Sequence, residues 1–180
     1  MLRLFVAVPI PDDVADKIAR LQTGLDGAKW SPRENLHLTL RFVGPIDERQ
    51  AEDLDSALGE IRVPPFNIDL GGIGYFGSNE PHAIWLGVKT NSFLSTLQNR
   101  CERACRLTGL VPAPRAYTPH VTICYLPRHQ PLDSVLAFQR AHNLFTVPNW
   151  SADRFYLYAS RTNGAGPSRY SIEAEYPLVG

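Results

Sequence analysis

The chain has 180 residues, of which 44% are hydrophobic, so it is long enough to bury one core. Eighteen basic residues balance eighteen acidic ones, and this neutrality excludes the broad positive field with which proteins hold long duplex nucleic acid. We therefore expect one domain over residues 1–180, with any nucleic-acid contact limited to an end or a single phosphate.

The N-terminal segment, MLRLFVAVPIP, has one Arg and a short apolar run that ends in prolines. It is too short to span a membrane and has no cleavage region of the kind that signal peptides carry. The three cysteines are odd in number and have no partners at zinc-ligand spacing, which indicates free thiols in a reducing compartment. The sequence thus predicts a cytoplasmic protein with no membrane partner, no metal and no cofactor.

The first elements follow one another closely. Residues 3–8 form a β-type run, and Asp12 or Asp13 can cap a helix whose apolar positions recur at helical spacing. Residues 36–43 alternate strictly, which predicts a strand with one polar face. The apolar face holds Leu36, Leu38, Leu40 and Phe42, and the opposite face holds His37, Thr39, Arg41 and Val43.

The later elements continue the interleaving of helices and strands. Two glycine-containing stretches, GGIGYFGSNEP and SRTNGAGPS, are typical of connections. Sharp turns and alternating patterns favour antiparallel pairing, and hence an α+β fold. The predicted helices cover 47–61, 92–107 and 132–141, and the predicted strands cover 66–70, 83–88, 120–126, 155–159 and 170–176.

A short pattern occurs twice. His37-Leu-Thr-Leu returns as His120-Val-Thr-Ile, and a predicted helix follows each copy. Side chains two apart on a strand share a face, so each copy presents an imidazole and a hydroxyl to the same side. We expect two pseudo-symmetric lobes of antiparallel sheet with outer helices, which face each other across a central cleft.

This pair of motifs suits phosphodiester cleavage. One neutral imidazole can take a proton from an attacking water while a protonated imidazole gives one to the leaving oxygen, so His37 and His120 are the candidate catalytic residues. The hydroxyls of Thr39 and Thr122 can donate to the non-bridging phosphate oxygens as charge develops. A cyclic ribose phosphate is itself strained, so the reaction has no strict need of a metal. The other three histidines, His82, His129 and His142, have no partner motif.

Several segments carry a family resemblance: RLFVAVPIP, WSPRENLHLTLRFVG, IWLGV, PHVTI and YASRTNGAGPSRY. With them the chain resembles the two-histidine (2H) phosphoesterase superfamily, and within it the bacterial and archaeal RNA 2',3'-cyclic phosphodiesterases, also called 2'-5' RNA ligase-like proteins. The resemblance implies metal-independent hydrolysis of a terminal 2',3'-cyclic phosphate of RNA to a 2'-phosphomonoester. It also implies that His37 is the acid at the ribose 3'-oxygen and that His120 is the base.

One position departs from the family. Its members usually place an Arg five residues after the second-motif histidine, where this chain has Tyr125. Arg128, just beyond the gap, and Arg41, on the face predicted for His37, are the candidates for the phosphate-binding charge. Tyr125 could instead stack on a base or donate through its hydroxyl.

Two other functions remain open from the sequence. The same site could act on other small cyclic or 2'-5'-linked nucleotides, with a 2'-5' ligase side activity, because an acid–base pair serves both directions. Alternatively the chain could be a non-catalytic RNA-end binder. In either case we expect a monomer whose partners are RNA ends or small nucleotides, rather than long duplexes.

Overall fold

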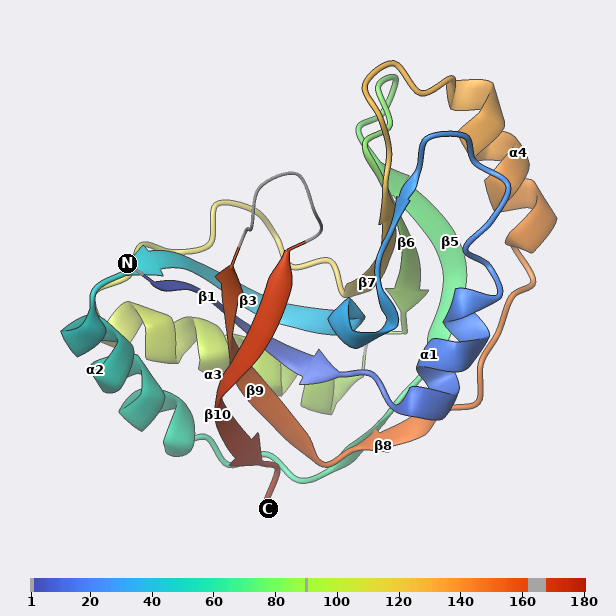
Figure 1. Ribbon diagram of the computed structural model, residues 1–180. Coiled ribbons are helices and arrows are strands. Elements are labelled where there is room, and N and C mark those ends of the chain that lie inside the picture. Colours follow the sequence, from blue (N-terminus) through green and yellow to red (C-terminus); the bar gives the residue numbers. More distant parts are fainter. Residues whose placement is uncertain (1, 90, 162–167) are drawn as a thin grey trace.

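The computed structural model describes residues 2–89, 91–161 and 168–180 (Figure 1). Within these residues, eight strands form one antiparallel sheet in the order β10-β9-β1-β3-β7-β6-β5, with β2 pairing with β7. The strands of this sheet are β1 (Leu2–Pro9), β2 (Lys29–Trp30), β3 (His37–Ile46), β5 (Leu70–Phe76), β6 (Ala83–Val88), β7 (His120–Tyr125), β9 (Arg154–Arg161) and β10 (Arg169–Pro177).

Helices and a small second sheet surround the large one. The helices are α1 (Asp12–Ala19), α2 (Glu48–Gly59), α3 (Ser92–Leu107) and α4 (Leu132–His142), with a short 3-10 turn η1 (Arg33–Asn35) before β3. β4 (Phe66–Ile68) pairs with β8 (Trp150–Ala152). No helix in the described residues is long and apolar enough to cross a membrane.

The large sheet consists of two halves that meet between β3 and β7. Among the described residues, the two strands share one cross-strand pair, Leu38 with Val121. In Figure 1 the halves diverge from this seam, with α2 and α3 beside one half and α1 and α4 beside the other. The predicted α+β class, with antiparallel lobes and outer helices, is confirmed.

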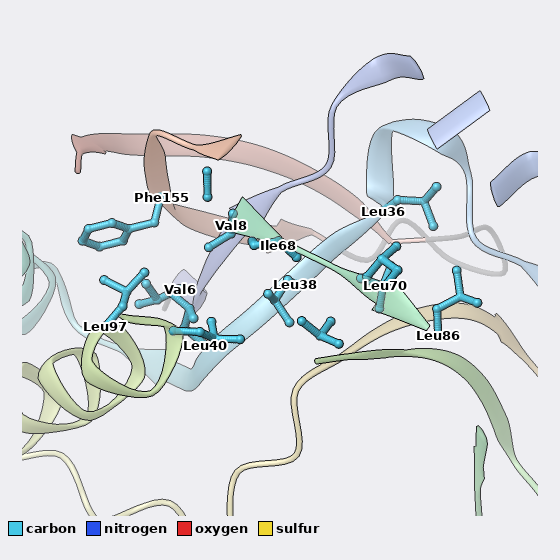
Figure 2. Packing of buried hydrophobic residues seen from close by; sticks show 14 of the residues in the cluster. Val6, Val8, Leu36, Leu38, Leu40, Ile68, Leu70, Leu86, Leu97 and Phe155 are labelled. Atoms are coloured by element: carbon cyan, nitrogen blue, oxygen red, sulfur yellow. The ribbon is translucent and has the colours of Figure 1, made fainter. Parts of the chain in front are cut away.

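One apolar cluster runs beneath the seam. Figure 2 shows side chains of β1, β3, β5 and β6 converging with those of α3 and β9. Leu38 and Leu86, from the two halves, are fully buried, and each such side chain contributes about 1.5–3 kcal/mol relative to exposure. Asp47 and Asn91 start α2 and α3 by accepting hydrogen bonds from the backbone of the first turn. The shared core holds the two halves in a fixed arrangement.

The predicted helices are confirmed, and so are most of the predicted strands. The strand predicted over 66–70 is divided, because β4 ends at Ile68 in the small sheet and β5 begins at Leu70 in the large one. The stretch GGIGYF was predicted as a connection, but it forms most of β5 and pairs with β6. Gly74 lies opposite Trp85, and a Cβ there would stand 2.2 Å from the indole Cη2, so this glycine makes room for a ring rather than a turn. The short strands β2 and β8 were not predicted. Residues 162–167 of the predicted connection SRTNGAGPS lie outside the described residues.

Candidate active site

The first motif strand contains a β-bulge directly after its threonine. β1 pairs with β3 at Thr39 and next at Arg41, so Leu40 is an extra residue. Because the bulge interrupts the alternation, Leu40 and Arg41 are both buried, whereas Phe42 is 64% exposed. The prediction that Arg41 shares the face of His37, and that Phe42 shares the face of Leu38, is therefore wrong.

Arg41 takes part in a buried ion pair beneath the sheet. Its Nε lies 2.5 Å from Oε2 of Glu102 on α3, and its Nη2 donates to the carbonyl of Val111 at 2.5 Å. Glu102 Oε1 also accepts from the backbone N–H of Ala113. Arg41 thus connects β3 to α3 and to the segment before β7, and its charge is directed away from the cleft.

The second motif strand repeats the bulge. β6 pairs with β7 at Thr122 and next at Cys124, which leaves Ile123 as the extra residue. Ile123 and Cys124 are both buried, and Tyr125, at the position that matches Phe42 in the first copy, is 54% exposed. The sequence echo is therefore also a geometric repeat.

Both motif histidines are held in the same way. His37 Nδ1 lies 2.6 Å from the carbonyl oxygen of Asn35, and His120 Nδ1 lies 2.6 Å from that of Thr118. A carbonyl oxygen only accepts, so each Nδ1 carries the hydrogen. Each Nε2 is then left as an acceptor when the ring is neutral, and as a donor when it is protonated.

Aromatic rings enclose the two imidazoles. The His37 ring centroid lies 4.8 Å from Phe5 and 5.3 Å from Tyr170, and that of His120 lies 4.9 Å from Phe76. Burial lowers the pKa of His37 from 6.5 to about 4, the positive charge of His120 acts in the same direction, and the hydrogen bond to Asn35 opposes them. Burial also lowers the pKa of His120. Both rings are therefore neutral near pH 7 in the empty site.

A cavity of about 480 Å³ opens beside His37. Thr122 and Tyr125 line it, so the structure brings three of the predicted site residues to one cavity. His120 is not among the lining residues, but it directly precedes Val121, which pairs with Leu38 directly after His37, so the two histidines lie on neighbouring strands. Thr39 is half-buried, and its carbonyl accepts from the Tyr117 hydroxyl. The lining residues are Lys29, Trp30, Ser31, Pro32, Asn35, His37, Thr122, Tyr125, Ser168 and Tyr170.

Arg128 and Lys29 differ from the sequence-based expectation. Arg128 is exposed beyond the end of β7 and is not among the lining residues. Lys29, which sequence reasoning missed, does line the cavity, next to Tyr125 on the neighbouring strand. The one signal in the sequence was its place directly before Trp30, where the matching segment WSPRENLHLTLRFVG begins. Among the described residues, no group of three or more His, Cys, Asp or Glu is arranged to hold a metal ion.

The fold and the paired histidines are those of a phosphoesterase, and the comparisons agree. The family model described as LigT like phosphoesterase matches residues 8–85. The chain is 31% identical over 134 residues to the RNA 2',3'-cyclic phosphodiesterase of Archaeoglobus fulgidus, which covers 72% of this chain and 76% of that one. It is 33% identical over 143 residues to the protein of the same name from Bacillus subtilis, and this match covers 72% of this chain and 78% of that one.

A solved structure shares the whole fold. E. coli LigT complexed with 3'-AMP superimposes with a TM-score of 0.79 at 24% identity, over 99% of both chains. The chain belongs to the RNA 2',3'-cyclic phosphodiesterase family, which confirms the resemblance seen in the sequence.

Proposed function

We propose that this protein hydrolyses the terminal 2',3'-cyclic phosphate of RNA, or of a small nucleotide, to a 2'-phosphomonoester. The observation that carries the proposal is the pair of imidazoles on neighbouring strands, each with Nδ1 bound to a carbonyl so that Nε2 is the nitrogen left for proton transfer, with a cavity of about 480 Å³ beside His37. The activity in the names of the relatives from Archaeoglobus and Bacillus supports it.

The reaction is an in-line displacement at phosphorus. His120 Nε2 takes a proton from water as the water oxygen bonds to phosphorus. The bond from phosphorus to the 3'-oxygen breaks, and His37 Nε2–H gives that oxygen its proton. The hydroxyls of Thr39 and Thr122 donate to the non-bridging oxygens. His120 ends protonated and His37 neutral, and exchange with solvent restores the starting state.

Because the pKa values of both histidines are lowered, their protonation depends on whether a substrate is bound. His37 is neutral in the empty site, so it must be protonated when the phosphate enters. A negative charge within about 4–6 Å of an imidazole raises its pKa, and an anionic phosphate near both rings does this for each of them. The bound phosphate thus supplies the negative charge that allows one of the two rings to be protonated during the reaction.

Tyr125 and Tyr170 are placed to receive the nucleoside. Both line the cavity, and Tyr125 is largely exposed. The pKa of Tyr170 is raised by burial and also by the charge of Tyr125 on the same cavity wall. Stacking of a base on such rings is tolerant of sequence, since every base has an aromatic face. We assign Tyr125 to the base or ribose.

We further propose that the protein acts as a monomer in the cytoplasm. Three cysteines are free and buried, which suits a reducing compartment. They are Cys101, Cys105 and Cys124.

The test is incubation with a 2',3'-cyclic mononucleotide in excess chelator, with the product analysed by phosphorus NMR. We expect turnover to a 2'-phosphate, and losses of at least about a hundredfold in His37→Ala and in His120→Ala. His129→Ala, at an exposed loop position, is the matched control.

Three results would contradict the proposal in different ways. Binding without turnover would indicate a non-catalytic RNA-end binder. Activity that chelation abolishes and one divalent ion restores would rule out the two-histidine mechanism. A dominant 3'-phosphate product would exchange the roles of His37 and His120.

A further inference from the structure

We propose that Lys29 is the cationic residue that binds the reacting phosphate in this site, an inference that rests on the proposed function. Apart from His37, Lys29 is the one basic residue among the described residues that line the cavity, and that lining contains no Asp or Glu. The part of the cavity wall that the structure describes therefore has a positive charge and no carboxylate to neutralise it.

The register of β2 sets the direction of the Lys29 side chain. In the antiparallel pair β2–β7, Lys29 lies opposite Tyr125, and Trp30 lies opposite Cys124. Residues directly opposite each other project to the same face of a sheet, and neighbours along a strand project to opposite faces. The Trp30 ring packs on Phe138 of α4, although Trp30 also contributes to the cavity lining, and Cys124 is fully buried. Lys29 and Tyr125 consequently share the cavity face.

β2 is attached firmly to the strand that carries the second motif. The backbone N–H of Ser31 donates to the carbonyl of Ile123 at 2.9 Å, and its hydroxyl donates to that of Thr122 at 3.0 Å. Gln22 Nε2 donates to the Ser31 carbonyl at 2.7 Å. These bonds fix the backbone of Lys29 relative to Thr122, so that only the side chain has to be ordered when the phosphate binds.

Neither arginine considered from the sequence can take this role. The Arg41 guanidinium is paired with Glu102 beneath the sheet. Arg128 is exposed and does not line the cavity. Lys29 instead brings its charge from β2 to the neighbourhood of Tyr125, on the motif strand itself.

The chemistry needs such a charge. A cyclic phosphodiester carries one negative charge and the monoester product carries up to two, so negative charge accumulates on the non-bridging oxygens during the displacement. An ammonium group is a compact donor that stabilises this charge from several angles. Lys29 should therefore contribute more to the transition state and product than to binding of the neutral nucleoside.

The experiment compares Lys29→Met with Lys29→Arg and with Lys89→Met. Lys89 is an exposed lysine beyond the end of β6 that does not line the cavity, which makes it a matched control. With a 2',3'-cyclic mononucleotide, we expect kcat/KM to fall at least about tenfold in Lys29→Met, as for loss of a charged donor to the reacting oxygens. Lys29→Arg should retain most of the activity, and Lys89→Met should match the wild type.

A second measurement uses binding alone. Titration calorimetry with a nucleoside 2'-monophosphate should show an affinity loss in Lys29→Met, whereas the parent nucleoside should bind all variants equally. Equal kcat/KM and equal monophosphate affinity in Lys29→Met and Lys89→Met would overturn the assignment of Lys29. If the wild type itself does not turn over, the proposed function fails, and the monophosphate affinities still decide the role of Lys29. Equal melting temperatures establish that the variants are folded.

Discussion

Removing the His37 imidazole should make the stability of the protein less dependent on pH. Its pKa is about 4 in the folded chain and 6.5 in the unfolded chain, chiefly because burial disfavours the charged ring. Between these values the unfolded state binds more protons, so acid favours unfolding. From pH 7.5 to pH 5 this one group removes about 2 kcal/mol from the free energy of unfolding, a range in which Asp and Glu side chains titrate little.

The assay is urea unfolding at these two pH values for the wild type, His37→Asn and His129→Asn. The stability difference between the two pH values should be about 2 kcal/mol smaller in His37→Asn than in the wild type. His129 is exposed and has a positive φ of 63°, a conformation that Asn tolerates, so His129→Asn should follow the wild type. Equal pH dependence in all three proteins would refute the idea that His37 is desolvated in the folded state.

Three further predictions concern the surroundings of the site. Arg41→Met should cost about 3 kcal/mol in urea unfolding, the lower end of the range for a buried ion pair, because Glu102 is largely but not fully buried and has Arg106 at 4.0 Å. Arg41→Met/Glu102→Leu should recover most of this loss, and an equally unstable double variant would contradict the ion-pair account. Gly74→Ala should lower stability by about 1–3 kcal/mol, since the new Cβ displaces the Trp85 ring that lies 6.0 Å from His120; an unchanged melting temperature would show that the ring is free to move. In pH–rate profiles, both limbs of kcat/KM should lie below pH 6.5, because the pKa values of both histidines are lowered in the free enzyme. The limbs of kcat should lie at higher pH, because the bound phosphate raises both pKa values. Superimposable profiles of kcat and kcat/KM would contradict this.

The sequence predicts the motif strands well as far as each threonine and fails directly beyond it. An inserted residue leaves the apolar–polar alternation of Leu40, Arg41 and Phe42 unchanged in the sequence, although it reverses the faces of the last two. The bulge arises from the pairing with β1, so the sequence of Leu40, Arg41 and Phe42 alone does not predict it. The motif histidines lie before the bulge, which is why they could be identified and Arg41 could not.

The other failures have the same non-local origin. Gly74 lies in a glycine-rich stretch that is typical of a turn. Its lack of a side chain instead makes room for the ring of Trp85 on the adjacent strand. β2 has two residues, too few for any periodicity, and is held by Ser31 and Gln22 rather than by a pattern of its own. Lys29 is therefore recognised as a site residue only when the strand opposite it is known.

The seam between β3 and β7 sets the distance between the two histidines, whereas the hydrogen bonds within each half set the orientation of each ring. Each imidazole is fixed within its own half-sheet, by the carbonyl of Asn35 or of Thr118. The distance between the two imidazoles therefore depends on how the halves meet at Leu38 and Val121, both fully buried. Altering the volume of those two side chains would widen or narrow that span without disturbing the hydrogen bonds of either histidine. Leu38 and Val121 are not among the residues that line the cavity, so the distance between the imidazoles can be changed from positions in the apolar core.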